Sequence, residues 1–138
     1  MHEYRTSRRI EFSDTDLAGV VHFARFFVFM ETAEDEFLRL LGASFTMHDQ
    51  GRTIGWPKVS VACDYRNPAR YGDTLDIHLA VEKVSRRTIT YRFAFTRDGT
   101  EIARGRTTSA CVEMKPDGTF ASGPIPATLA GRIEPAGS

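Results

Sequence analysis

Two aspartates lie one residue apart, just ahead of the most apolar segment of the chain. Asp14 and Asp16 are followed by Gly19 and His22, and a run of phenylalanines begins at Phe23. In extended backbone, side chains two residues apart point the same way, so the two carboxylates are expected to interact. Either repulsion raises the proton affinity of one carboxylate, or helix-end amides and arginines stabilise both as anions.

Helix capping is the simplest structural role for these aspartates, because aspartate is a preferred cap. A cap bonds to the second or third amide of its helix, however, and the apolar helical period begins near Phe23, too far along the chain for Asp16 to cap directly. A small turn over residues 17–20 remains open as a use for Asp16. The flexible Gly19 would let the backbone approach a ligand closely.

Other catalytic arrangements are absent from the sequence. It has no serine in a Gly-x-Ser-x-Gly setting, no histidine pair at metal spacing and no glycine-rich phosphate loop followed by lysine. What remains is an aspartate that attacks a carbonyl, or activates water to attack it, while free amides at the start of the helix receive the oxyanion. A thioester fits this apparatus because it is a more reactive acyl donor than an ester or an amide. We expect no metal and no cofactor.

Composition narrows the class of protein. The chain has 138 residues, with 18 Lys and Arg against 18 Asp and Glu, which predicts one domain and argues against nucleic acid as a partner. The N-terminal residues lack the apolar core of a signal peptide, and no apolar run reaches membrane-spanning length. We therefore expect a cytoplasmic protein with no membrane span. Cys63 and Cys111 are expected to be small buried side chains.

Periodicity predicts one long helix among strands. The helix is expected over residues 23–41, ended by Gly42, with an apolar stripe of Phe23, Phe26, Phe27, Met30, Phe37 and Leu41. Strands are expected over residues 4–12, and period-two alternation predicts half-buried faces at Val59, Val61, Cys63 and Tyr65, at Leu75, Ile77, Leu79 and Val81, at Ile89, Tyr91, Phe93 and Phe95, and at Thr108, Ala110, Val112 and Met114.

These elements predict an α+β fold in which a single antiparallel five-stranded sheet wraps around one long central helix, with the last four strands forming a meander. The core is expected over about residues 3–114 of one domain, 1–138. Residues 115–138 are rich in Pro, Gly and Ser and predict a peripheral strap and tail, with a turn near residues 126–130.

The segment Arg9-Ile-Glu-Phe-Ser-Asp-Thr-Asp-Leu-Ala-Gly-Val-Val-His-Phe-Ala-Arg-Phe resembles the signature of the 4-hydroxybenzoyl-CoA thioesterase family of hotdog-fold proteins. The resemblance continues through the helix end at residues 37–42, the strand at residues 59–65 and the turn at residues 68–75. It implies a hotdog fold and an acyl-CoA thioesterase, with coenzyme A as part of the substrate.

The resemblance also implies roles for individual residues. Asp16 corresponds to the catalytic carboxylate, acting as nucleophile or general base, and the Phe23 N–H corresponds to the amide that polarises the substrate carbonyl. Asp14 occupies a recurrent family position and is assigned a structural role. Related enzymes often have Tyr-His where this chain has His22-Phe23, so His22 is a candidate for contact with substrate or water, or else a helix-entry residue.

Binding of coenzyme A phosphates needs cations, and Arg86 and Arg87 match an arginine pair that the resembling enzyme uses there. The residue that follows is lysine in the family and Thr88 here, and a solvated hairpin is the alternative for all three. Arg25, in the first helical turn, is a weaker candidate because it opposes the helix dipole.

Two further side chains are candidates for the acyl pocket. Trp56 precedes a strand that lies near the substrate in this family, and core packing is its alternative role. Glu34 lies in the apolar stripe, where a carboxylate must be paired, protonated or facing a cleft, and a subunit-interface ion pair is the expected account.

A sheet with open edges predicts a homodimer or homotetramer, with active sites at the subunit interface. The leading hypothesis is thus hydrolysis of an acyl- or aryl-CoA thioester. The alternatives are a hotdog hydratase or dehydratase acting on an acyl thioester, and a non-catalytic acyl-CoA-binding module.

Overall fold

One long helix forms the centre of the computed structural model, which describes residues 1–137. Helix α1 (Arg25–Leu40) buries a face whose members recur every three or four residues: Phe26, Phe29, Met30, Ala33, Glu34, Phe37 and Leu38. Gly42 follows the helix with φ +80°, a left-handed conformation that ends the helix as the sequence predicted.

The helix begins two residues later than predicted, and this corrects its buried stripe. Phe23 precedes the helix and is 62% exposed, whereas Phe29, expected to widen the apolar arc beside the stripe, is fully buried. Residues 22–25 form a separate turn, closed by the Arg25 N–H donating to the His22 carbonyl at 2.9 Å. The sequence prediction applies the helical period to residues 23 and 24, which belong to this turn and not to the helix.

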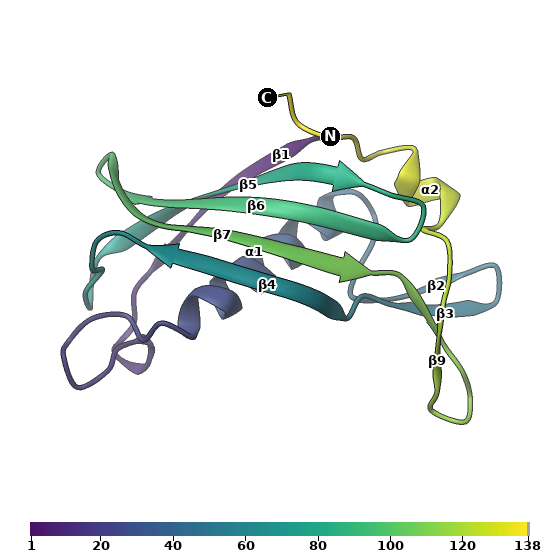
Figure 1. The fold of residues 1–138 in the computed structure, drawn as a ribbon, viewed down its shortest axis with the longest axis horizontal. Helices are drawn as coiled ribbons and strands as arrows, with labels where there is room; N and C mark the ends of the chain where they lie inside the picture. Colours follow the sequence, from purple (N-terminus) through teal and green to yellow (C-terminus); the bar gives the residue numbers. More distant parts are fainter. Residues whose placement is uncertain (138) are drawn as a thin grey trace.

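A five-stranded antiparallel sheet curves around α1 (Figure 1), in the order β1-β5-β6-β7-β4. Its strands are β1 (Glu3–Arg9), β4 (Lys58–Tyr65), β5 (Thr74–Val84), β6 (Thr88–Arg97) and β7 (Thr100–Ala110). The five-stranded sheet around a helix is as predicted, but the four-strand meander is wrong because β4 pairs with β7 rather than with β5. Residues 66–73 form no tight hairpin. Instead, the Val21 N–H donates to the Ala69 carbonyl, and the Ile10 N–H donates to the Asp73 carbonyl.

A second, four-stranded sheet has the order β2-β3-β8-β9. It comprises β2 (Thr46–Asp49), β3 (Arg52–Gly55), β8 (Val112–Met114) and β9 (Phe120–Ser122). The expectation of a single sheet is therefore wrong. The predicted strand over residues 108–114 is interrupted at Cys111, whose N–H donates to the Arg87 carbonyl. Before this break, the buried side chains are Thr107 and Ser109 rather than Thr108 and Ala110.

The remaining elements are short. A single 3-10 turn, η1 (Phe12–Asp14), follows β1, and α2 (Ala127–Ala130) occupies the place of the predicted turn near residue 126. The C-terminal segment runs back beside β5, where the Ala136 N–H donates to the Val81 carbonyl. Within residues 1–137, no helix has the length and apolar character needed to cross a membrane.

Strand β4 forms an edge of the larger sheet and presents apolar side chains to solvent. Val59, Val61 and Tyr65 are 62%, 49% and 45% exposed, so the expected half-buried face is wrong for an isolated chain. A long edge strand with exposed apolar side chains is a template for pairing with another chain. The β4 edge is therefore a candidate surface for contact between subunits.

Close packing of α1 on the sheet depends on Gly105 in β7. A Cβ at this position would lie 2.1 Å from Met30 Cε and 2.7 Å from its Sδ, and Met30 is itself buried. We expect Gly105→Ala to lower the free energy of unfolding by about 1–3 kcal/mol through overpacking, as measured by urea denaturation. Gly137→Ala, where a Cβ meets nothing within 4 Å, is the matched control, and equal stability of the two variants would contradict this packing account.

Candidate active site

The loop that carries Asp16 is a closed turn between β1 and α1. The Asp16 N–H donates to the Val20 carbonyl at 2.9 Å, and the Gly19 N–H donates to the Asp16 carbonyl at 3.0 Å. Gly19 has φ +79°, a conformation that glycine adopts without steric cost. Gly19 therefore shapes the turn, while its contact with a ligand stays a prediction.

The Asp16 carboxylate is exposed and only half engaged. Its Oδ1 accepts a hydrogen bond from the Ala18 N–H at 2.8 Å, whereas Oδ2 has no hydrogen-bond partner among residues 1–137. Asp16 lines a cavity of about 390 Å³ together with Phe23. The structure thus leaves one carboxylate oxygen available to a bound molecule.

Phe23 also lines this cavity. Its carbonyl accepts a hydrogen bond from the Tyr65 hydroxyl at 2.9 Å, but its N–H donates to no group in the described part of the chain. Phe23 lies just ahead of α1, whose dipole favours negative charge near its first turn. A carbonyl oxygen bound at the Phe23 N–H would therefore be stabilised as it gains negative charge.

Residues at the end of β4 and just after it complete this cavity, and they were not identified as site residues from the sequence. The lining includes Tyr65, Arg66 and Asn67, with apolar surface from Val20, Val21, Phe26, Pro68 and Ala69. Burial, with a contribution from Cys63, raises the pKa of Tyr65 to about 12, so Tyr65 is a neutral hydrogen-bond donor. The turn at Asn67-Pro68 marks where the strand ends, but nothing local indicates that it lies beside Asp16.

His22 lies next to this cavity without lining it. Its side chain is exposed, its Nδ1 accepts a hydrogen bond from the Ala24 N–H at 3.2 Å, and its ring stacks on Phe23 at 4.7 Å between centroids. These contacts describe a helix-entry residue in the free chain. A contact between His22 and substrate stays a prediction.

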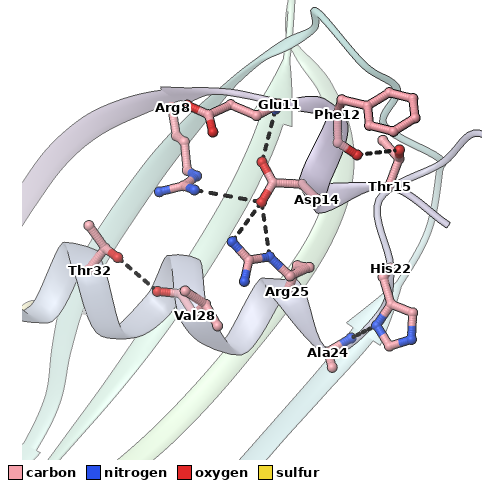
Figure 2. A network of polar contacts seen from close by, with 10 residues as sticks. All are labelled: Arg8, Glu11, Phe12, Asp14, Thr15, His22, Ala24, Arg25, Val28 and Thr32. Atoms are coloured by element: carbon pink, nitrogen blue, oxygen red, sulfur yellow. Dashed lines mark hydrogen bonds and ion pairs between the residues drawn. The ribbon is translucent and has the colours of Figure 1, made fainter.

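Asp14 has a different environment from Asp16, although the two are one residue apart. Its side chain is fully buried, and Arg25 Nη2 lies 2.7 Å from its Oδ1 (Figure 2). Burial alone would raise the pKa of Asp14, but the Glu11 N–H and the Arg25 and Arg8 guanidinium groups outweigh it and hold the pKa below its ordinary value. Arg25 is thus engaged by Asp14 rather than free for a phosphate.

The predicted phosphate-binding residues lie at the other end of the sheet. Arg86 and Arg87 are exposed in the hairpin between β5 and β6, near α2, while the loop before α1 lies at the opposite end (Figure 1). Arg87 Nη1 approaches Ser122 Oγ at 3.4 Å, and Thr88 Oγ1 donates to Ser85 Oγ at 3.0 Å. One chain does not bring this hairpin to Asp16.

Trp56 lines a second cavity, of about 330 Å³, together with Glu31, Phe45 and Lys58. Its ring is buried, at 6% exposure, and its Nε1 has no hydrogen-bond partner among residues 1–137. This cavity lies at the beginning of β4, whereas Tyr65 and the Asp16 cavity lie at its end. Trp56 and Asp16 therefore belong to separate hollows within one chain.

Glu34 is paired within the chain. Its Oε1 lies 2.7 Å from Lys58 Nζ, and Ser109 Oγ donates to its Oε2 at 3.0 Å. Burial is the largest influence on Glu34 and raises its pKa above the ordinary value despite these partners. The subunit-interface ion pair expected from the sequence is replaced by this intrachain pair, which the period of the helix alone did not reveal.

Glu34 makes the stability of the chain depend on pH. A carboxyl whose pKa is raised by folding stabilises the fold in its protonated form, fully below the unfolded pKa of about 4.3, and this contribution is lost as pH rises through the folded pKa. The stability of the wild type relative to Glu34→Gln is expected to fall as pH rises above about 4, until Glu34 is ionised in the folded protein. Urea denaturation across this range checks the expectation, and a growing advantage of the wild type would contradict it.

In the part of the chain that the structure describes, no group of three His, Cys, Asp or Glu side chains gathers to hold a metal ion. Cys63 is half-buried and Cys111 is buried, and both are free thiols. The polar residues that line the Asp16 cavity are Asp16, Tyr65, Arg66 and Asn67.

Comparisons with known proteins give the family. The sequence model of the thioesterase-like superfamily matches residues 10–133. A 1,4-dihydroxy-2-naphthoyl-CoA hydrolase of Synechococcus elongatus is 30% identical over 131 residues, covering 94% of this chain and 93% of that protein. An acyl-CoA thioesterase of Haemophilus influenzae is 30% identical over 106 residues, covering 77% and 78% of the two chains.

A solved structure supports the hotdog fold expected from the sequence. A mutant 4-hydroxybenzoyl-CoA thioesterase complexed with 4-hydroxybenzoyl-CoA superposes with a TM-score of 0.81, covering 95% of this chain and 98% of that one. At 16% identity this likeness concerns the fold alone. Together with the family match over most of the chain, it confirms the resemblance recognised in the sequence: the chain belongs to the thioesterase-like superfamily of hotdog-fold thioester hydrolases.

Proposed function

We propose that this protein hydrolyses the thioester bond of an acyl- or aryl-CoA. The observation that carries the proposal is that one cavity is lined both by Asp16, which has a free carboxylate oxygen, and by Phe23, whose N–H at the entry to α1 has no partner among residues 1–137. A nucleophile or base beside an oxyanion donor is what acyl transfer to water requires. The two 30% identical relatives named above, a naphthoyl-CoA hydrolase and an acyl-CoA thioesterase, support the substrate class.

The chemistry follows from these groups. The thioester carbonyl oxygen accepts a hydrogen bond from the Phe23 N–H, which draws electron density from the carbonyl carbon. The Asp16 carboxylate then either attacks this carbon or removes a proton from an attacking water. In the first route the carbon–sulfur bond breaks to leave a mixed anhydride with Asp16, which water then hydrolyses; in the second, water adds to the carbon before the same bond breaks. In both routes the coenzyme A sulfur leaves as a thiolate that takes up one proton of the water, and water supplies the second oxygen of the product acid. Coenzyme A enters as part of the substrate, and the route needs no resident cofactor.

We further propose that the complete site is shared between two copies of the chain. The exposed edge of β4, with Val59 and Val61 facing solvent, suits antiparallel pairing with the same strand of a second copy. Such pairing places the beginning of one β4 beside the end of the other. The Asp16 cavity would then adjoin the Trp56 cavity of the second copy.

This arrangement also gives the hairpin arginines a role. In a single chain, Arg86 and Arg87 lie at the end of the sheet where β4 begins (Figure 1), so in the pair they approach the Asp16 cavity of the second copy. Exposed guanidinium groups there would bind the phosphates of coenzyme A, with the Thr88 hydroxyl as a neighbour. The hairpin arginines would therefore lie far from Asp16 of their own chain because they serve the Asp16 cavity of the second copy.

Release of free thiol from a panel of coenzyme A esters tests the proposal. The panel contains benzoyl, hydroxybenzoyl, short-chain and long-chain acyl esters, so that the same assay identifies the acyl class. We expect turnover of at least one class. Tight binding of these esters without turnover would instead support a binding module.

A further inference from the structure

The buried aspartate of the loop before α1 is held by more groups than a simple turn requires. Asp14 Oδ2 accepts a hydrogen bond from the Glu11 N–H at 2.9 Å, and Oδ1 accepts one from Arg25 Nε at 2.9 Å (Figure 2). Arg25 Nη2 lies 2.7 Å from the same oxygen, and Arg8 Nη2 lies 3.6 Å from it. The carboxylate therefore joins the end of β1 to the first residue of α1.

Main-chain bonds connect this pair to the Phe23 amide. The Asp14 carbonyl accepts a hydrogen bond from the His22 N–H at 2.8 Å, and the His22 carbonyl accepts one from the Arg25 N–H at 2.9 Å. The His22 carbonyl and the Phe23 N–H belong to one planar peptide unit, so holding the carbonyl fixes the direction of the N–H. The side chains of Asp14 and Arg25 thus link the two residues whose main chains orient this peptide.

Stability alone is a poor explanation for the pair. Arg25 places a positive charge in the first turn of a helix, where the dipole opposes it. Removing a carboxylate and a guanidinium from water costs free energy that their attraction often fails to recover. Both Arg8 and Arg25 also pack over the Phe29 ring, at 4.7 and 6.0 Å from its centroid, so the charges are held rigidly. An arginine that directs two N–H groups at one oxygen of a buried carboxylate fixes the geometry of the pair more than it adds stability.

We infer that Asp14 and Arg25 are positioning residues, which hold the Phe23 N–H and the Asp16 turn in the geometry that the reaction requires without touching substrate. This inference rests on the proposed function. Asp14 is separated from Asp16 by Thr15 alone, and an isolated bridge pairs Thr15 with Val21 across the loop. Movement of Asp14 would therefore displace the catalytic carboxylate and the oxyanion donor together, and small misplacements of reacting groups are costly to rate.

Asp14→Asn tests the inference because it keeps the shape of the side chain and removes its charge. We expect kcat to fall about 10–100-fold, with KM changed less than about threefold. Hydrogen exchange at the His22 and Arg25 amides, whose bonds to the Asp14 and His22 carbonyls hold this peptide, is expected to accelerate in the free protein because the peptide is less firmly held. Arg25→Lys, which keeps the charge but loses the planar fork, should show the same changes to a smaller degree, and it carries the test if Asp14→Asn does not fold.

Asp49→Asn is the matched control, since Asp49 also pairs with an arginine, Arg52, at 3.0 Å in a distant hairpin. It is expected to leave kcat and the exchange of the His22 and Arg25 amides unchanged. Wild-type kcat and wild-type exchange in folded Asp14→Asn would overturn the inference, as would a loss of activity that only follows the unfolded fraction. If the wild type hydrolyses no ester, the proposed function fails, while exchange at the His22 and Arg25 amides still decides whether Asp14 holds this peptide.

Discussion

Replacing Asp16 by asparagine is expected to lower kcat by about 10²–10⁴-fold, as loss of a nucleophile or general base usually does. The fold should persist because the side chain is exposed and because the asparagine carbonyl can still accept the hydrogen bond from the Ala18 N–H. Substrate affinity should change little, because the amide has the same shape and reaches the same cavity. Steady-state thiol release and calorimetric titration with a substrate ester measure the two effects separately.

Asp98→Asn provides the control for this substitution. Asp98 lies in the turn between β6 and β7 with φ +50°, a conformation that asparagine adopts readily, and it is absent from the Asp16 cavity. The control should hydrolyse at the wild-type rate. Wild-type turnover by Asp16→Asn would show that another group drives the attack.

Replacing Val61 by lysine is expected to separate the subunits and to remove activity with them. Val61 is 49% exposed near the middle of the β4 edge. In an antiparallel pair of β4 strands the two lysines would lie close together, and like charges facing each other across strands are destabilising. We expect light scattering to report a monomer and thiol release to fall by at least about 10-fold, since a composite site would be divided.

Leu40→Lys adds the same charge at another exposed apolar position, the last residue of α1, which is 59% exposed. This control should keep both assembly and activity. A Val61→Lys monomer with full activity would contradict the shared site, because each chain would then hold all that catalysis needs. A Val61→Lys dimer would place the interface elsewhere.

Local sequence signals predicted the parts of the fold that depend on near neighbours. The three- and four-residue spacing of apolar side chains identified α1, and Gly42 marked its end in the left-handed conformation observed. Asp98-Gly99, a residue pair typical of tight turns, joins β6 to β7. In each case one short segment contains the physical cause, namely amphipathic burial or a positive φ.

Long-range pairing was not predictable in the same way. β4 alternates as a half-buried strand would, yet it lies at an edge of the sheet. The reason is that residues 66–73 do not return beside β4 but lead to β5, which is separated from β4 by β6 and β7. Tyr65 consequently reaches the Phe23 carbonyl, 42 residues away in sequence. No periodicity encodes such a contact, and the same limit applies to the bond between Lys58 and Glu34.

In the candidate site, too, the residues marked by a local motif were predictable, and their surroundings were not. The Asp-x-Asp motif and its distance from the helix indicated Asp16, and family resemblance indicated the Phe23 amide. The different surroundings of the two aspartates depend on Arg25 and Arg8, which reach Asp14 but do not contact Asp16. Sequence spacing suggested that the two charges would interact, whereas folding buries one and leaves the other at the cavity.

The rate of the chemical step tests most directly whether Asp16 drives hydrolysis. Steady-state turnover can be limited by product release, so thiol formation should be followed in a single turnover, with enzyme in excess over an ester that the wild type hydrolyses. With substrate bound equally by both proteins, thiol should appear at least about 100-fold more slowly with Asp16→Asn than with the wild type. Equal single-turnover rates would contradict the account, because they would remove the Asp16 carboxylate from the chemical step.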